Sequence, residues 1–114
     1  MTATVTPLHP AHARQRQTVF DRTELSRILD IYGRMVAAGQ WRDYAITFGR
    51  DHAVFAAFRR ASERPELQLW KRPELRAKGQ LYALVGEHGQ IVKRGSDLAA
   101  VLAPVARRLL KAVE

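Results

Sequence analysis

The segment DYAITFGRDHAVFAAFRR, residues 43–60, contains two β-strand patterns joined by a turn, in a chain of 114 residues. Over residues 43–48, large apolar side chains alternate with small or polar ones, which is typical of a β-strand. Residues 49–51 form a turn, and residues 52–60 carry apolar side chains at both parities. A strand that is apolar on both faces usually lies inside a sheet. We therefore predict a β-hairpin whose second strand is central and covered on both faces.

Three more strand patterns follow this hairpin. The third strand covers residues 67–70, the fourth covers residues 81–85, and a short fifth strand covers residues 91–93. The intervening Gly-Glu-His-Gly at residues 86–89 indicates that the last two strands form a hairpin. Because the connections are too short for parallel crossovers, we predict an antiparallel meander of four or five strands.

A helix is predicted before the sheet, over residues 22–38. Asp21 is suited to cap the first turn, with Glu24 three positions later to return the bond. Phe20 before the cap and Leu25 inside the helix fit a hydrophobic staple. The apolar residues at helical spacing are Leu25, Ile28, Leu29, Tyr32, Met35 and Val36.

Two glycines lie at the end of this predicted helix and inside it. Gly39 follows its predicted end and suits the left-handed conformation that ends many helices. Gly33 lies inside the helix, where glycine costs about 1 kcal/mol relative to alanine. We expect a strand or a second helix to approach closely at Gly33 in compensation.

A second helix closes the chain. Ser96 is the expected N-cap, and Asp97 complements the positive end of the helix. Pro104 interrupts the pattern, so the helix either kinks near residues 100–104 or breaks and restarts with Pro104 at its first position. The apolar stripe consists of Leu98, Val101, Leu102, Val105, Leu109 and Val113. The predicted fold is an α+β domain: an N-terminal helix, an antiparallel meander and a C-terminal helix kinked near Pro104.

Residues 1–19 differ in composition from the rest of the chain. They are rich in Thr, Ala, Pro and His, contain no acidic residue and show no periodicity, so we expect a disordered, weakly basic tail. His9 and His12 flank Pro10 in this tail and make a poor metal site. Residues 20–114 are expected to form a single domain.

The composition excludes several classes of protein. The chain has no cysteine, which rules out disulfides, thiol catalysis and cysteine-type zinc sites. No apolar run approaches the ~18 residues of a membrane span, and no apolar signal core is present, so we expect a cytoplasmic protein.

The balance of charge is strongly basic. The formal net charge is +8, mostly from arginine, which fits either an anionic partner or a solvated surface in a protein from a GC-rich genome. The segment RRASERPELQLWKRPELRAK, residues 59–78, concentrates cations around one tryptophan. This pattern suits a platform for single-stranded nucleic acid, but it also fits a core tryptophan with cations at the end of a sheet. The candidate surface comprises Arg59, Arg60, Arg64, Trp70, Lys71, Arg72, Arg76 and Lys78, together with Lys93 and Arg94 at the end of the last strand.

Catalytic and cofactor motifs are absent from the sequence. Neither glycine-rich phosphate loop is present, nor is a zinc-protease or deaminase signature. His52 and His88 fall in predicted turns and meet only if both turns lie at one end of the sheet. Ser62 lies beside Glu63 without a base in reach, and the glutamates of this segment fit ion pairs better than acid–base chemistry. We therefore predict no catalytic residues, no metal and no cofactor.

Four blocks of sequence resemble a known family. They are YGRMVAAGQWRDYAI (32–46), AVFAAFRRASERP (53–65), KRPELRAKGQLYALV (71–85) and KRGSDLAAVL (93–102). The chain is similar over residues 20–113 to the alphaproteobacterial domain-of-unknown-function family 2794. The resemblance implies a single bacterial cytoplasmic domain and transfers no activity, cofactor or site residue.

Three functional hypotheses follow. The first is a non-enzymatic binding module that engages an acidic protein partner or a second copy of itself, because two helices cover one sheet face and leave apolar residues on the other. The residues expected on that open face are Phe55, Ala57, Trp70 and Tyr82. The second is nucleic-acid binding through residues 59–78. The third and weakest is a small-molecule pocket or an enzyme without a motif.

Overall fold

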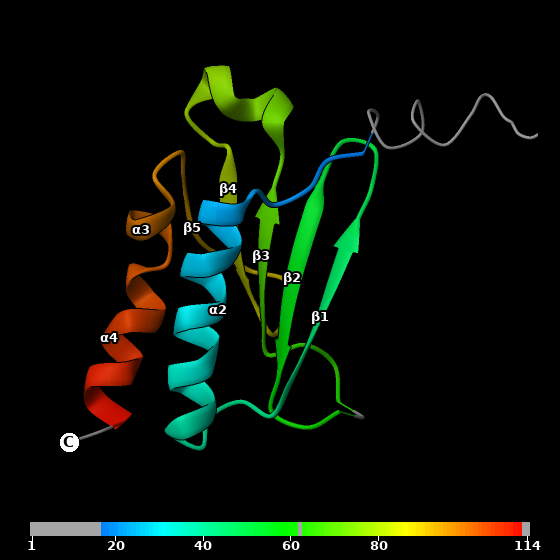
Figure 1. Cartoon of the computed structure of the whole chain (residues 1–114). Helices are drawn as coiled ribbons and strands as arrows, with labels where there is room; N and C mark the ends of the chain where they lie inside the picture. The colour runs from blue at the N-terminus through cyan, green and yellow to red at the C-terminus, as the bar shows by residue number, and fades with distance from the viewer. Residues whose placement is uncertain (1–16, 62, 113–114) are drawn as a thin grey trace, which may run out of the picture.

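The computed structural model describes residues 17–61 and 63–112. Figure 1 shows one sheet with the helices packed against it. In chain order the elements are α2 (Arg22–Ala37), β1 (Asp43–Phe48), β2 (Ala53–Phe58), β3 (Leu67–Lys71), the 3-10 helix η1 (Pro73–Lys78), β4 (Tyr82–Gly86), β5 (Ile91–Gly95), α3 (Leu98–Val101) and α4 (Ala103–Ala112).

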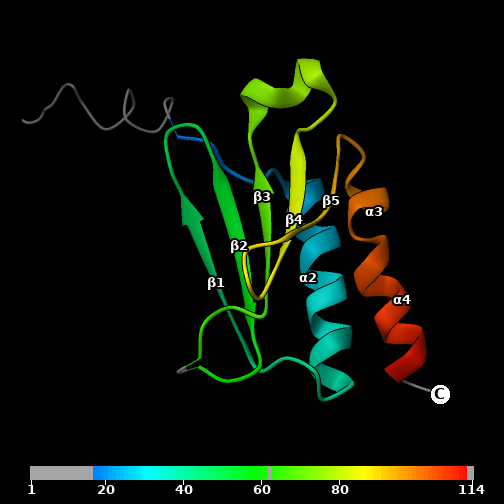
Figure 2. The ribbon, with the colours of Figure 1, turned by 180° about the vertical axis from the view of Figure 1, so that it is seen from behind.

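The sheet is the predicted antiparallel meander. Its five strands lie in the order β1-β2-β3-β4-β5, and each pairs antiparallel with its sequence neighbour. All three α-helices lie on the same side of the sheet, as the two opposite views show (Figures 1 and 2). The predicted α+β fold is therefore confirmed, and the opposite face of the sheet is open.

The register assigns each side chain to a face. Phe55 of β2 lies opposite Leu69 of β3, which in turn lies opposite Leu84 of β4. All three are buried beneath the helices, in one core with Met35 of α2 and Val105 of α4. The open face carries the other parity, because successive side chains of a strand point to opposite sides of the sheet.

β2 lies inside the sheet, as predicted, but the prediction that both of its faces are covered is wrong. β2 is second in the strand order, and no described helix covers its open-face residues Val54 and Ala56. These two side chains are nevertheless buried, because Val54 lies between Thr47 of β1 and Trp70 of β3. Each of these small side chains has a larger neighbour on β3, Trp70 beside Val54 and Gln68 beside Ala56.

The N-terminal helix begins as predicted. The Asp21 side chain accepts the Glu24 N–H at 2.8 Å, and the Glu24 side chain accepts the Asp21 N–H at 2.7 Å, which completes the capping box. Gly39 has a φ of 76° at the end of the helix, as predicted. The predicted apolar stripe is too wide, since Leu29 and Val36 are 38% and 41% exposed.

The C-terminal segment breaks in two, the second of the predicted alternatives. Asp97, not Ser96, is the N-cap of α3, and its side chain accepts the Ala99 N–H at 3.1 Å. The Ser96 hydroxyl instead accepts the Leu81 N–H at 3.3 Å. Pro104 is the second residue of α4, where a helix has no internal acceptor for the missing N–H.

The predicted tail contains residues that belong to the domain. Residues 1–16 of that tail lie outside the described part of the chain. Thr18 donates its backbone N–H to the Gly49 carbonyl at 2.8 Å, and the Val19 carbonyl accepts from Lys71 Nζ at 2.9 Å. The folded chain therefore already makes these bonds at residues 18 and 19, just before the boundary predicted at residue 20.

None of the described helices is long and apolar enough to cross a membrane.

Gly33 tests the cost of glycine in a helix. The predicted close approach is wrong, since a Cβ built at Gly33 meets nothing within 4 Å. We expect Gly33→Ala to stabilise the protein by about 0.5–1 kcal/mol, measured by urea denaturation, because alanine loses less backbone entropy. Gly39→Ala is the control and should destabilise, because its φ of 76° strains any residue with a Cβ. A lower midpoint for Gly33→Ala would contradict the open surroundings of this residue.

Candidate functional site

The structure does not assemble the predicted basic surface into one patch. Arg59, Arg60 and Arg64 follow β2, at the end of the sheet where β3 begins. Arg72, Arg76 and Lys78 lie beyond the opposite end of β3. A strand of five residues spans roughly 17 Å, so the two groups are separated by the length of β3. The segment 59–78 therefore presents two separate groups of cations.

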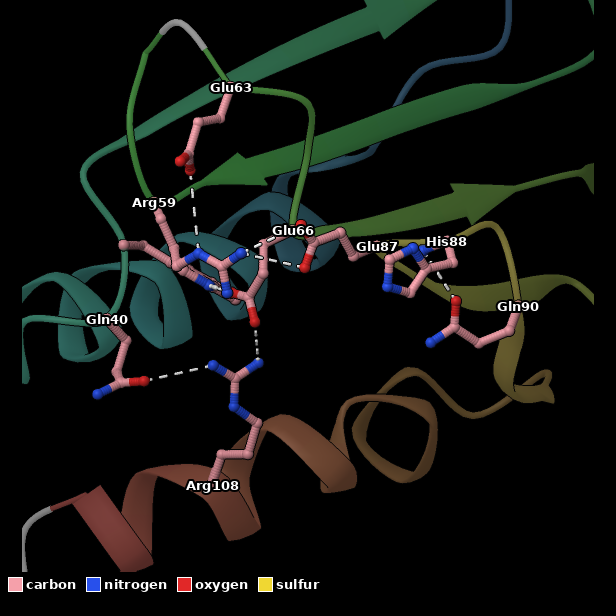
Figure 3. A network of polar contacts seen from close by, with 9 residues as sticks. Gln40, Arg59, Glu63, Glu66, Glu87, His88, Gln90 and Arg108 are labelled. Carbon is pink, nitrogen blue, oxygen red and sulfur yellow. Dashed lines mark hydrogen bonds and ion pairs between the residues drawn. The ribbon is translucent and has the colours of Figure 1, made fainter.

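In the group that follows β2, Arg59 is paired with two carboxylates (Figure 3). Arg59 donates to both carboxylate oxygens of Glu87 at 3.1 Å and lies 3.9 Å from Glu63. Nearby, Arg108 of α4 pairs with Glu66 at 2.8 Å. The expectation that glutamates of this segment form ion pairs holds for Glu63 and Glu66, although their partners are Arg59 and, from outside the segment, Arg108.

Lys71 is not a surface residue, so its place in the predicted basic surface is wrong. It points to the helix face, is 9% exposed, and donates through Nζ to Glu24 Oε1 at 2.7 Å. The position of Lys71 on β3 places its side chain on the helix face. Lys71 and Leu69 are two residues apart and share that face, whereas the side chain of Trp70 lies on the open face.

Three of the predicted residues do come together, on the open face of the sheet. Trp70, Arg72 and Arg94 line a groove of about 380 Å³. Arg94 lies opposite Ala83 and so belongs to the open face, whereas Lys93 lies opposite Leu84, on the helix face. We call this hollow the open-face groove; it is lined by Gln68, Trp70, Arg72, Leu75, Gln80, Leu81, Ala83, Val85, Ile91 and Arg94.

Trp70 contacts three other side chains at this groove. Its indole Nε1–H donates to Gln68 Oε1 at 2.8 Å, and the Arg72 guanidinium lies 4.8 Å from the ring centroid. The His52 ring lies 5.2 Å away, and His52 is itself bonded to Asp51 at 2.9 Å. The hydrogen bond from His52 lowers the pKa of the Asp51 carboxyl below its usual range. Trp70 is half-buried on the sheet surface, so it is not a core residue.

The rest of the open face differs from the expectation. Phe55, Ala57 and Tyr82 are predicted there, but all three are buried on the helix face. Gln68 and Gln80, the neutral polar groups of the groove, are absent from the prediction. The signal that identifies Gln68 is its parity with Trp70, because residues two apart on a strand share a face.

The two histidines in turns do not meet. His52 follows the β1–β2 turn and His88 lies in the β4–β5 turn, at opposite ends of the sheet. Within the described residues, no group of three or more histidines, aspartates and glutamates could hold a metal ion.

The buried polar cluster lies on the helix face. Glu24 accepts from Lys71 through Oε1 and from the Tyr82 hydroxyl through Oε2. Lys71 also donates to the Val19 carbonyl. A small hollow of about 260 Å³ reaches Glu24 and Tyr82 from outside. Since these groups are hydrogen-bonded to one another, the cluster ties α2 to β3 and β4 and offers no unused acid or base.

A second hollow, of about 660 Å³, lies between α2 and α4 and is lined mainly by aliphatic side chains, including Ile31, Ala106 and Leu110. The charged residues that line it are Arg27, Asp30 and Arg34, and Asp30 pairs with Arg34 at 3.3 Å. It contains no arrangement of polar groups that would orient a ligand.

The buried ion pair between Lys71 and Glu24 can be tested by comparing the stabilities of single and double variants. Lys71→Met should lower the free energy of unfolding by about 3–5 kcal/mol, because it leaves the Glu24 carboxylate buried without its counter-charge. Glu24→Gln combined with Lys71→Met should cost clearly less, since the introduced amide still accepts from Tyr82 and bears no charge. Urea denaturation of the single and double variants measures the difference. Equal or additive losses would contradict a coupled pair.

From the buried Tyr82 hydroxyl we expect the folded protein to lose stability at alkaline pH. Burial, reinforced by the hydrogen bond to Glu24, raises the pKa of the Tyr82 hydroxyl above its ordinary value of 10.0. The Tyr82 hydroxyl therefore ionises at a lower pH in the unfolded chain than in the folded chain. Its contribution to stability is complete below about pH 10 and is lost as the pH rises toward the pKa of the folded chain. Denaturation at about pH 9 and about pH 11 should show a smaller fall for Tyr82→Phe than for the wild type. An equal fall in both would show that Tyr82 is not responsible.

One of the comparisons with known proteins gives a match. The family model described as "Protein of unknown function (DUF2794)" matches residues 18–102. No curated protein and no solved structure matches the chain. The matched span begins at Thr18, which bonds to the β1–β2 turn, and includes the whole sheet and the open-face groove. This chain therefore belongs to the family of proteins of unknown function DUF2794.

Proposed function

We propose that this domain is a non-enzymatic binding module that engages an acidic protein segment through the open face of its sheet. The observation that carries this proposal is the open-face groove, where Trp70, Arg72 and Arg94 meet on a face that no described helix covers. An apolar face of a sheet that is left open commonly serves as an interface.

The lining of the groove favours a ligand with both anionic and apolar parts. Arg72 and Arg94 supply two guanidinium groups, and no carboxylate of the described residues lines the groove. Guanidinium groups bind carboxylates in bidentate geometry. Leu75, Val85 and Ile91 provide an apolar floor. A peptide that places Asp or Glu beside a large apolar residue satisfies both parts of this lining.

Nucleic acid is the second candidate, favoured by the same Trp70 between cations. Platforms for single strands stack successive bases on several aromatic rings, whereas Trp70 is the only aromatic residue among the described residues that line this groove. Arg72 and His52 already lie against its ring. The cations of residues 59–78 are also divided between two ends of the sheet, which weakens the case for a continuous phosphate track. The single aromatic ring and the divided cations therefore favour an acidic protein segment over nucleic acid as the ligand.

Selection from a phage-displayed random peptide library against the full chain tests this proposal. We expect enriched peptides to combine acidic and large apolar residues, and to bind as labelled synthetic peptides in fluorescence anisotropy. Arg72→Gln with Arg94→Gln should weaken this binding at least about tenfold, which corresponds to about 1.4 kcal/mol. Binding should also weaken between about 50 mM and about 200 mM salt, because both contacts are charged.

The matched control is Arg22→Gln with Arg107→Gln, which removes the same charge from exposed helix positions outside the groove. It should leave peptide binding nearly unchanged. Peptides that bind both double variants equally, or a selection that enriches no acidic peptide, would overturn the proposal. Tighter binding of oligouridine or oligothymidine that is lost only in Arg72→Gln/Arg94→Gln would establish the nucleic-acid candidate instead.

A further inference from the structure

The outer edge of β1 is an open strand edge. Gly49 donates its N–H to the His52 carbonyl at 2.8 Å, and the same register continues along β1 and β2. In an antiparallel pair, alternate residues direct their backbone groups toward the partner strand. Residues 45 and 47 therefore bond toward β2, and Tyr44, Ile46 and Phe48 direct their N–H and C=O groups outward. Within residues 17–61 and 63–112, no other strand pairs with this edge.

Large apolar side chains are exposed along the same edge. Tyr44 and Phe48 are 42% and 40% exposed, on the face of β1 that carries the helices. Tyr44 is held in place by the Tyr32 ring at 4.8 Å and the Phe55 ring at 5.5 Å between centroids. Leu29 and Val36 lie one turn of α2 before and after Tyr32, and they are exposed to a similar extent. The edge thus combines backbone groups that pair with no described strand and a fixed apolar surface.

We propose that two copies of this chain pair through β1, antiparallel, about a two-fold axis at Ile46. Their two five-stranded sheets then form one continuous sheet. The helices of both copies lie on the same face of it, because the two-fold axis is perpendicular to the sheet.

The sequence of β1 is self-complementary in this register. With the axis at Ile46, Tyr44 lies opposite Phe48 of the second copy, and Ile46 lies opposite Ile46. Aromatic pairs directly across a sheet are among the favourable cross-strand pairs. An axis at Ala45 would instead place Phe48 opposite Arg42 and Tyr44 opposite Ile46, so neither aromatic ring would face another. The Asp43 carboxylate, which accepts the Tyr44 N–H at 2.8 Å in the single chain, gives way to a backbone carbonyl.

A second copy fits this edge better than an unrelated strand does. An unprotected edge is a risk for open-ended aggregation, and proteins normally block it with charges, proline or a bulge. β1 has none of these between Tyr44 and Phe48, and its pairing with β2 is regular. A two-fold pairing closes both edges at once and stops there. This inference does not depend on the peptide-binding proposal.

Sedimentation equilibrium of the full chain tests the oligomeric state. We expect twice the mass of one chain, and we expect Phe48→Lys to raise the dimer dissociation constant at least about tenfold, because each dimer contains two Tyr44–Phe48 contacts. The matched control is Leu110→Lys, because Leu110 is 66% exposed and belongs to α4, on the side of the molecule away from β1. It should leave the dimer unchanged. A monomeric wild type, or a dimer weakened only by Leu110→Lys, would overturn the proposal.

Cysteine cross-linking tests the register on a nearly unaltered fold. The chain has no native cysteine, and positions 45 and 47 are exposed on the open face. With the axis at Ile46 they form non-hydrogen-bonded pairs with Cα atoms about 4.5 Å apart, a distance that suits a disulfide. Ala45→Cys with Thr47→Cys should give a disulfide-linked dimer under mild oxidation, and each single variant should give much less. Absence of the cross-link, or equal cross-linking by a single variant, would overturn the pairing even if Phe48→Lys fails to fold.

Discussion

Glu24 is the residue through which one helix is fixed onto the sheet. It closes the first turn of α2 through the capping box, and the same carboxylate accepts from Lys71 of β3 and Tyr82 of β4. A buried charge is tolerated only where it is paired and hydrogen-bonded, so this position of α2 over β3 and β4 is the one that satisfies all of these groups. Lys71 also binds the Val19 carbonyl, which fixes the chain just before the helix.

This anchoring leaves the two faces of the sheet unequal. With α2, α3 and α4 on one face, the core closes around Met35, Leu69 and Leu84. The other face retains a half-buried tryptophan between a histidine and an arginine, and β1 extends beyond the helices. The proposed groove and the proposed dimer edge both arise from this one-sided coverage. They use different surfaces, so a dimer through β1 would present two grooves on the same side of a joined sheet.

Local patterns predicted the elements well because their causes are local. The capping box at Asp21, the left-handed glycine at residue 39 and the break around Pro104 depend on residues within one or two turns. The strands of the meander followed from short connections and hairpin turns. The candidate site was predicted less well. Of the basic residues grouped along residues 59–78, Lys71 is buried and Arg59 is ion-paired to Glu87. Linear proximity carries no information about which end or face of a sheet a residue occupies.

Local patterns in the sequence predicted the order of the α-helices and strands and both ends of α2, but not the 3-10 helix η1. The family followed from the resemblance of four sequence blocks. Which parity of each strand faces the helices became clear from the packing of the helices on the sheet. That choice placed Phe55 and Tyr82 in the core, Trp70 in the groove and Lys71 against Glu24. The physical reason is that every strand offers two faces of mixed character, and a helix can cover only the one where the combined strands bury the most apolar surface and satisfy the buried charges.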